Sequence, residues 1–216
     1  MRHRSRQCSS PSCRLRFPVQ EDSELGAQCP LCGASTDFVD AAWTTPPAPK
    51  AGVLPGPRVQ ALLDNVRSLR NVGAIFRTAD GAGVDHLHLC GFTPTPAHPK
   101  LAKTALGAES SVAWTRHFDA LRAVEELTQH DARLWALEGG DAAESIFDLS
   151  PELDGGPIVL VLGHEVSGVD VRVLDRCERR VCIPMAGIKG SLNVSVAFGV
   201  AAFALRHGLR RGQTGA

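Results

Sequence analysis

The stretch IPMAGIKGSLNVSVAFGVAAF, residues 183–203, passes from a glycine-rich loop into an almost wholly apolar segment. Three small polar residues, Ser191, Asn193 and Ser195, stand where the apolar segment begins. Such residues are typical of helix N-termini, where their side chains accept hydrogen bonds from free backbone N–H groups. We therefore predict a helix over 193–207, and its apolar character on all sides indicates a buried element.

The chain before this helix alternates between strand-like and helix-like segments. PIVLVLG, residues 157–163, has the pattern of a strand buried on both faces, and DALRAVEELTQH, residues 119–130, has the spacing of an amphipathic helix. This alternation predicts an α/β domain with a mostly parallel sheet and helices on both faces. The other strands are expected over 58–65, 84–90, 111–118, 132–138 and 179–185, and the other helices over 72–83 and 170–178.

Two common nucleotide-binding loops are absent from the sequence. In GIKGS, Gly190 separates Lys189 from Ser191, whereas a phosphate-binding loop needs the lysine directly before Ser or Thr. DGAGVDH, residues 80–86, lacks the third glycine of the dinucleotide fingerprint, and a strand rather than a helix follows it. The sequence therefore gives no support for ATP hydrolysis or nicotinamide chemistry.

Four of the seven cysteines lie within the first 32 residues. Cys8 and Cys13 are followed, after fifteen intervening residues, by Cys29 and Cys32, a spacing that matches a two-knuckle zinc site. Two disulfides or four unligated thiols are the alternatives, but disulfides are rare in proteins of reducing compartments. Because four thiolates leave no open coordination position, we expect a structural zinc that folds a small ribbon over 1–43.

The front of the chain is locally basic although the whole chain is neutral. Its 23 basic residues balance 23 acidic ones, so any nucleic-acid surface must be local. Five prolines and two glycines mark residues 44–57 as a linker. The basic front is interpreted either as a solvated, frayed terminus or as a phosphate-contacting arm; its arginines are Arg2, Arg4, Arg6, Arg14 and Arg16.

The sequence also bears on location in the cell. No apolar run approaches the length of a membrane span, and the first residues lack the apolar core of a secretory leader. We therefore expect a cytoplasmic protein without membrane association.

Three segments, 64–84, 158–169 and 183–203, each combine an apolar strand or helix with a glycine turn and a few polar side chains. In an open α/β sheet, ligands bind beyond the carboxyl ends of the strands, so we expect these segments to meet there. They contain no Ser-His-Asp pattern and no cluster typical of a catalytic metal. The polar side chains expected to gather at the site are Asn71, Arg77, Glu165, Ser191 and Asn193.

These segments resemble the three motifs of the SpoU/TrmH family of RNA 2′-O-ribose methyltransferases, in the SPOUT superfamily. The matching stretches are NVGAIFRTADGAGV at 71–84, LGHEVSGV at 162–169 and IPMAGIKGSLNVSVA at 183–197. KTALGAES, residues 103–110, is also similar to a family segment. The resemblance covers about 58–210 and leaves the cysteine-rich front outside the shared domain.

The resemblance implies that the domain over 58–216 transfers a methyl group from S-adenosylmethionine to a ribose 2′-hydroxyl of tRNA or rRNA. It also implies RNA as a partner, a homodimer, and a deep trefoil knot at the C-terminal end. General rules of chain topology would exclude a knot, so that expectation comes from the resemblance alone. For the homodimer, we expect the last helix to contribute through Phe198, Ala201 and Leu205.

Roles for individual residues follow from the same resemblance. Arg77 resembles the motif-one arginine at the target ribose, and Asn71 its companion. Because a guanidinium stays charged, we expect Arg77 to bind the neighbouring phosphate and stabilise the developing alkoxide rather than act as a base. Glu165, Ser191 and Asn193 resemble the polar residues that set the site. The implied cofactor-binding residues are Leu137, Leu162, Gly163, Ile183, Met185 and Leu192.

Each of these residues has a structural alternative. Arg77 could be a surface arginine, Glu165 an acid favoured by a helix dipole, and Ser191 or Asn193 a helix cap. The sequence departs from the family pattern at His164, where asparagine is frequent, and at Ser167, where a basic residue is frequent, and these departures bear on the substrate rather than the chemistry. Two other functions stay open: a knotted base methyltransferase, and a zinc-ribbon RNA-binding or assembly protein with a non-catalytic knotted domain.

Overall fold

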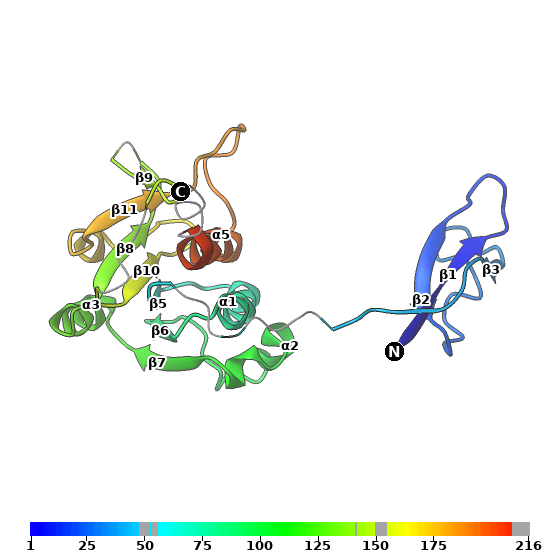
Figure 1. Ribbon diagram of the computed structural model, residues 1–216, viewed down its shortest axis with the longest axis horizontal. Helices are drawn as coiled ribbons and strands as arrows, with labels where there is room; N and C mark the ends of the chain where they lie inside the picture. The colour runs from blue at the N-terminus through cyan, green and yellow to red at the C-terminus, as the bar shows by residue number, and fades with distance from the viewer. Residues whose placement is uncertain (48–51, 53–55, 141, 150–154, 209–216) are drawn as a thin grey trace, which may run out of the picture. The chain divides into compact units, whose positions relative to one another are not determined.

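A computed structural model describes residues 1–47, 52, 56–140, 142–149 and 155–208 of the chain (Figure 1). The chain divides into two compact units, Met1–Gly52 and Val53–Ala216. The predicted linker, 44–57, spans this division, and residues 48–51 and 53–55 of it lie outside the described residues. Each unit has its own sheet.

The smaller unit is an antiparallel sheet around its first strand. Strand β1 (Arg2–Cys8) pairs with β2 (Arg16–Gln20), β3 (Thr36–Phe38) and β4 (Trp43–Thr44), in each case antiparallel. The interpretation of the first residues as a frayed terminus is therefore wrong, because they form the strand that all the others contact.

The larger unit has a seven-stranded sheet in which every pair of neighbouring strands is parallel. This confirms the predicted α/β class. The strand order is β7-β6-β5-β10-β8-β11-β9. The strands are β5 (Val59–Asp64), β6 (His86–Cys90), β7 (Ala113–His117), β8 (Arg133–Leu137), β9 (Glu144–Ser145), β10 (Ile158–Leu162) and β11 (Arg179–Cys182).

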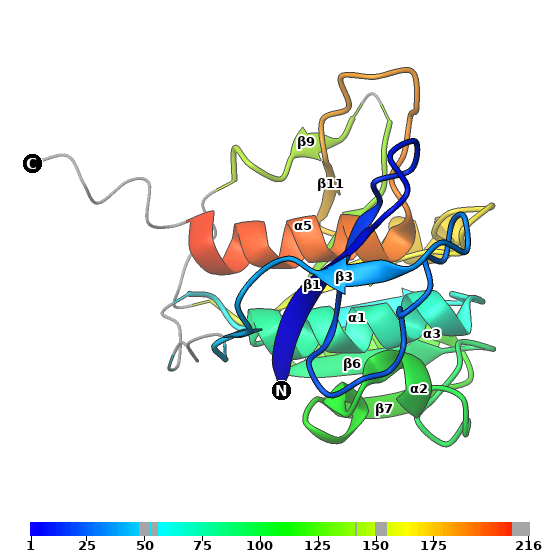
Figure 2. The same ribbon diagram turned by 90° about the vertical axis from the view of Figure 1, so that its right-hand side faces the viewer.

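Helices cover both faces of this sheet. On one face α1 (Leu69–Ala82) and α5 (Val194–His207) lie side by side (Figures 1 and 2) and share a hydrophobic core with the strands. On the other face, α3 (Ala120–Gln129) and α4 (Val171–Leu174) contribute to a second core. Strand β10 is buried along its whole length because its side chains alternate between the two cores, as predicted for a strand covered on both faces.

Short elements account for the differences from the predicted pattern. The segment after α1 and β6 contains α2 (Ala102–Ala105) and the 3₁₀ turn Ala108–Ser110, both packed against α1. The helix expected over 170–178 is only the single turn of α4. Strand β9, which was not predicted, pairs with β11, and β11 therefore lies between two strands that precede it in the chain. The trefoil knot stays a prediction.

The residues of the last helix, α5, that were predicted to form a dimer contact lie in the core instead. Phe198, Ala201 and Leu205 are buried in the core of their own chain, so the prediction that they form a dimer surface is wrong. The reason is that α5 is apolar on nearly all sides, and the pattern alone does not say which side meets the sheet. The large apolar side chains that α5 exposes are Val196 and Phe203, which are 51% and 42% exposed.

The sheet reverses its strand order beside β5 and β10. The chain leaves β5 towards β6 on one side, and leaves β10 towards β11 on the other. A crevice at the carboxyl ends of the strands is expected at such a point. Among the helices that the structure describes, none has the length and apolar character needed to cross a membrane.

Candidate active site and metal centre

A cavity of about 360 Å³ lies at the carboxyl ends of β8, β10 and β11, against the start of α5. Its size falls within the range of small-molecule sites. Three of the predicted catalytic residues line it: Glu165, Ser191 and Asn193. All six residues predicted to hold the cofactor line it as well: Leu137, Leu162, Gly163, Ile183, Met185 and Leu192.

One wall of the cavity is the tight loop that follows β10. His164 and Gly168 face each other across this loop and exchange two backbone hydrogen bonds of 3.0 and 2.9 Å. A side chain on Gly163 would overlap the backbone of Gly168 and Val169, and Gly168 itself adopts a φ of +72°. The loop can therefore close this tightly only with glycine at both positions.

The ring of His164 fixes the tip of the same loop. Its Nδ1 accepts hydrogen bonds from the backbone N–H groups of Val166, at 3.1 Å, and of Ser167, at 3.3 Å. Because Nδ1 is an acceptor, the neutral imidazole carries its proton on Nε2. His164 therefore holds the loop with one ring nitrogen and has an N–H donor on the other.

Glu165 comes from this loop but binds the backbone just before a different helix, α1, whose N-cap is Ser68. Its carboxylate accepts hydrogen bonds of 3.1 Å from the backbone N–H groups of Arg67 and Ser68, just before α1. Partial burial raises the pKa of the Glu165 carboxyl, but backbone hydrogen bonds and the Asn71 amide lower it by more, so the net pKa lies below its ordinary value. The carboxylate is thus held ionised at the N-terminus of α1, where the helix dipole favours it.

Three predicted polar residues from three distant segments form a chain of hydrogen bonds. The Nδ2 of Asn71 donates to Oε1 of Glu165, and the Nδ2 of Asn193 donates to Oδ1 of Asn71, both at 3.1 Å. The Oδ1 of Asn193 accepts from the backbone N–H of Ser195, which makes Asn193 the N-cap of α5. The cap predicted as an alternative for Ser191 therefore belongs to Asn193.

Arg77 stands apart from this chain. It is exposed on α1, six residues after Asn71, and does not line the cavity. The structure thus brings four of the five predicted catalytic residues to one place and leaves Arg77 outside it.

The sequence reasoning missed Glu138, which lines the cavity and accepts a 3.2 Å hydrogen bond from the backbone N–H of Val169. Its position directly after the strand residue Leu137 was the available signal.

The four front cysteines converge in the smaller unit. Their Sγ atoms all lie within 4.8 Å of one another, with Cys8 and Cys32 at 3.4 Å and Cys13 and Cys29 at 3.8 Å. A zinc ion with Zn–S bonds of about 2.3 Å in a tetrahedron would place its sulfurs about 3.8 Å apart, so the donor set fits this metal. No fifth ligand such as His3 belongs to this group among the described residues.

The backbone of the second knuckle favours a thiolate. Burial raises the pKa of the Cys29 thiol, but hydrogen bonds from the backbone of Cys32 and Leu31 lower it by more, to about 7. Gly33 follows with a φ of +74°, which closes the tight turn at no steric cost.

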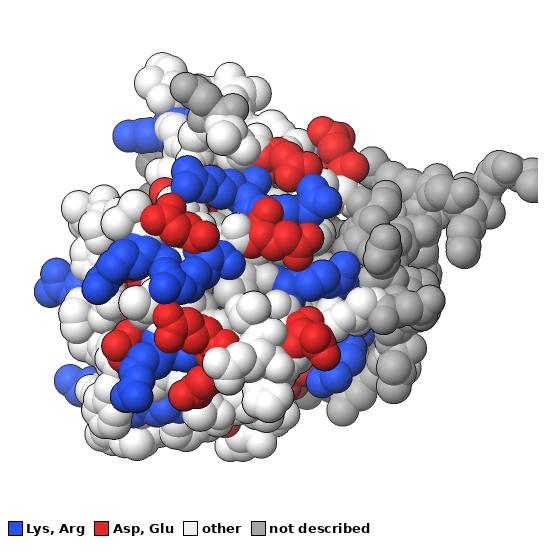
Figure 3. Space-filling model, turned by 90° about the vertical axis from the view of Figure 1, so that its left-hand side faces the viewer, with Lys and Arg blue, Asp and Glu red and all other residues white. Residues whose placement is uncertain are grey.

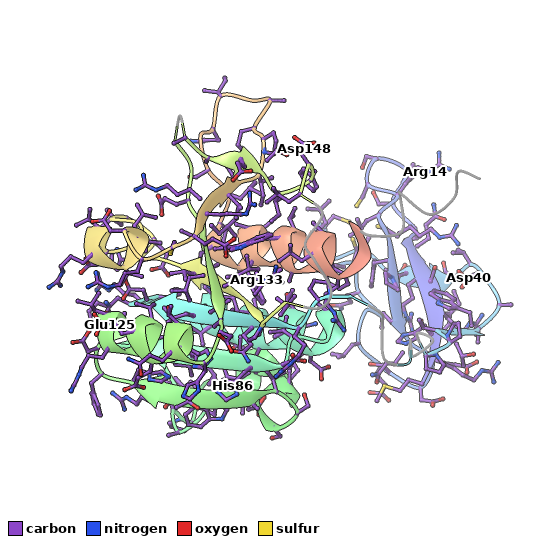
Figure 4. The ribbon with its side chains drawn as sticks, turned by 60° about the vertical axis from the view of Figure 1, so that its left-hand side comes forward. Arg14, Asp40, His86, Glu125, Arg133 and Asp148 are labelled. Carbon is purple, nitrogen blue, oxygen red and sulfur yellow. The ribbon has the colours of Figure 1, made fainter. Side chains whose placement is uncertain are left out.

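The arginines of this unit are largely engaged within it. Arg2 pairs with Glu21 at 3.2 Å, and Arg16 pairs with Asp40 at 3.1 Å; Asp40 is labelled in Figure 4. Both Arg4 and Arg6 stack on the ring of Phe38, with guanidinium-to-centroid distances of 4.1 Å. These contacts stabilise the sheet, and they weaken the interpretation of the front as a free phosphate-contacting arm.

The charges on one face of the larger unit alternate in sign. Lys and Arg side chains are interspersed with Asp and Glu on the face shown in Figure 3. Pairs of this kind include Arg176 with Glu125, at 3.2 Å, which join the segment after α4 to α3. A mixed surface of this kind does not provide the single-sign field that favours a nucleic-acid backbone.

Comparison with protein families gives the assignment. A family model described as the SpoU rRNA methylase family matches residues 58–203. The chain belongs to the SpoU rRNA methylase family. The match covers the whole sheet, the cavity and most of α5, and it leaves the cysteine-rich unit outside.

Individual relatives agree with the family. A 23S rRNA (guanosine-2′-O-)-methyltransferase RlmB from Ralstonia nicotianae is 36% identical over 148 residues, which are 68% of this chain and 58% of the relative. The chain therefore spans less than two thirds of the length of such curated relatives.

Solved SpoU structures share the fold. A TrmH-family protein from Porphyromonas gingivalis matches with a TM-score of 0.63 and 28% identity, over 77% of this chain and 64% of that one. The SpoU methyltransferase AviRb from Streptomyces viridochromogenes, in complex with AdoMet, matches with a TM-score of 0.63 and 23% identity, over 74% of this chain and 62% of that one. At that identity the second likeness concerns the fold alone.

Proposed function

We propose that this SpoU-family chain transfers a methyl group from S-adenosylmethionine to a ribose 2′-hydroxyl of rRNA or tRNA. The observation that carries the proposal is the junction of the 360 Å³ cavity with the Asn71–Glu165–Asn193 chain of hydrogen bonds at its rim. Membership of the family supports the same reaction, and the Ralstonia nicotianae relative bears the name of a ribose methyltransferase.

The residues of the cavity suit the proposed cofactor. Leu137, Ile183 and Leu192 present partly exposed apolar surface for an adenosine, while Leu162 is buried and Gly163 begins the tight turn that lines the cavity. S-adenosylmethionine would supply the electrophilic methyl group. The protein's part is to align a ribose hydroxyl with that methyl and to exclude competing water.

The polar residues at the rim divide the remaining tasks. Glu165 and Asn193 fix the Asn71 amide between them, so that the starts of α1 and α5 stay in register at the cavity. Arg77 lies exposed on α1 and binds the phosphate next to the target ribose, where its charge stabilises the developing alkoxide. A phosphate oxygen or a water accepts the hydroxyl proton, because a guanidinium is too weak a base.

We also propose that Cys8, Cys13, Cys29 and Cys32 bind one structural zinc ion and that the chain works as a cytoplasmic homodimer. The convergence of the four sulfurs supports the zinc. The side chains of Val196 and Phe203, which α5 leaves 51% and 42% exposed, support a dimer contact, since large apolar side chains are costly to leave in water.

The decisive experiment is to map ribose methylation in cellular RNA with and without this protein. Loss of one or a few 2′-O-methyl marks, restored by the intact gene, is the expected result. A lost base methylation would identify the base methyltransferase instead. Unchanged methylation, together with no binding of S-adenosylmethionine in calorimetry, would favour the non-catalytic RNA-binding function.

A further inference from the structure

An exposed aromatic ring lies beside the cavity. Phe92, in the loop between β6 and α2, is 61% exposed. Its ring meets that of His164 edge to face, with centroids 6.4 Å apart and planes at 89°. His164 lines the cavity, so the two rings stand at its rim.

The backbone beneath Phe92 is held firmly. Oδ1 of Asn65 accepts a 3.3 Å hydrogen bond from the Phe92 N–H, and a side chain on Gly91 would overlap the same Asn65 amide. The next residue, Thr93, is buried; its hydroxyl donates to the Leu63 carbonyl and accepts from the Val66 N–H, both at 3.1 Å. The loop is thus anchored on both sides of an aromatic residue that it leaves in water.

The second ring is equally fixed, and none of the described residues accepts a hydrogen bond from its Nε2. The two backbone hydrogen bonds to Nδ1 of His164 set the plane of the imidazole and place its proton on Nε2. A rigid aromatic face beside a rigid N–H donor is the arrangement with which proteins hold unpaired RNA bases.

We propose that Phe92 and His164 form a platform for an unpaired nucleobase next to the ribose that is methylated. The base stacks on the Phe92 ring, and Nε2–H of His164 donates a hydrogen bond to an acceptor on the RNA. This inference rests on the proposed function, and it assigns substrate recognition to two residues outside the Asn71–Glu165–Asn193 chain. Stacking accepts any base, so the platform selects single-stranded RNA rather than one sequence.

Substitutions at position 92 of the full chain test the stacking face. With S-adenosylmethionine saturating, single-turnover methylation is measured against the concentration of RNA prepared from cells that lack the protein. Phe92→Trp should keep the RNA affinity, whereas Phe92→Leu, which keeps apolar bulk without a π face, should weaken it about tenfold or more. Calorimetry should show unchanged affinity for S-adenosylmethionine in both variants at position 92, since Phe92 does not line the cavity.

Phe118 offers a matched control. It is 84% exposed directly after β7, and Arg116 stacks on its ring at 4.8 Å. Phe118→Leu should leave the RNA dependence unchanged.

A substitution of His164 tests the contact between the two rings. His164→Asn can still accept hydrogen bonds in its loop but has no ring. Its effect on RNA affinity should be less than additive with that of Phe92→Leu, because the two rings are in contact.

Three outcomes would overturn the platform. Equal RNA affinity of Phe92→Leu and the parent chain would remove the stacking role. A change in molecular mass of the Phe92 variants in solution, with methylation per protomer unchanged, would make the ring a protein contact. If the parent chain methylates no RNA, both the proposed function and the platform are rejected. If the parent chain methylates RNA and the Phe92 variants show the same dependence on RNA concentration, only the platform is rejected.

Discussion

The side-chain amide of Asn193 donates a 3.1 Å hydrogen bond to the side-chain oxygen of Asn71, across 122 residues of chain. The bond joins the N-cap of α5 to the first turn of α1, the two helices that cover one face of the sheet. Asn193 also accepts a hydrogen bond from the backbone N–H of Ser195. One side-chain amide therefore caps α5 and also binds Asn71 of the neighbouring helix α1. An aspartate can perform only the first of these tasks.

Substitution of Asn193 should therefore separate the two tasks. Asn193→Ala loses the cap and should destabilise the fold by about 1 kcal/mol. Asn193→Asp keeps an acceptor for the Ser195 N–H but presents a charged oxygen to the acceptor oxygen of Asn71. We expect Asn193→Asp to melt close to the parent chain and to lose about tenfold or more in single-turnover methylation. Equal activity of Asn193→Asp and the parent would show that the bond to Asn71 has no role in the reaction.

The sequence predicts those parts of the site whose position depends only on where a strand or helix begins or ends. Glu165 follows a buried parallel strand, and Asn193 precedes a helix, so both had to lie at the carboxyl edge of the sheet. The bond from Glu165 to the start of α1 was not predictable, because it depends on how β5 and β10 pair. Likewise, the inward face of α5 was misassigned because its apolar residues surround the helix, and the packing against α1 and the sheet decides which of them are covered.

Arg77 should affect the reaction without affecting the cofactor. Since it lies outside the cavity, Arg77→Ala should leave the affinity for S-adenosylmethionine unchanged in calorimetry and reduce single-turnover methylation by a large factor, because the lost interaction belongs to the transition state. Arg77→Lys should rescue little, since a point charge does not replace the planar fork. Arg122, exposed on α3, provides the control, and its alanine variant should retain full activity.

Substitution of Leu192 should weaken cofactor binding without slowing methyl transfer, the opposite of the result expected for Arg77. This half-exposed residue lines the cavity, and Leu192→Ala removes apolar surface there. We expect weaker binding of S-adenosylmethionine by about fivefold to thirtyfold, with little change in rate once the cofactor is saturating. A reduced rate at saturation with unchanged cofactor affinity would place Leu192 at the RNA instead.

The zinc prediction is tested by elemental analysis. Reductively purified protein should contain one zinc per chain, and Cys13→Ser should contain less because a thiolate ligand is lost. Cys177→Ser is the control: Cys177 is isolated in the larger unit, where its Sγ donates to the Val173 carbonyl, and a serine hydroxyl can replace it. Protein without stoichiometric metal, or equal zinc in Cys13→Ser and the parent, would contradict the assignment.

A cluster of three histidines should make the larger unit sensitive to acid. Nδ1 of His88 lies 3.1 Å from Nε2 of His117, and Nε2 of His88 lies 3.1 Å from Oε1 of Gln60. The ring of His86, which is labelled in Figure 4, packs against the ring of His88 with the centroids 4.5 Å apart. Burial, followed by the charges of His86 and His117, lowers the pKa of His88 to about 3. The pKa values of His86 and His117 are also lowered, chiefly by burial.

The sign of the effect follows from proton counts. Between pH 6.5 and pH 3 the unfolded chain protonates His88 while the folded chain keeps it neutral, so the unfolded state binds more protons and stability falls as the pH falls. At pH 5 the expected loss from His88 is about 2 kcal/mol relative to neutral pH. Urea unfolding at pH 7.5 and 5.0 measures it. His88→Gln should shrink the difference between the two pH values, whereas His130→Gln, at an exposed position, should not; an undiminished difference in His88→Gln would assign the acid sensitivity to other groups.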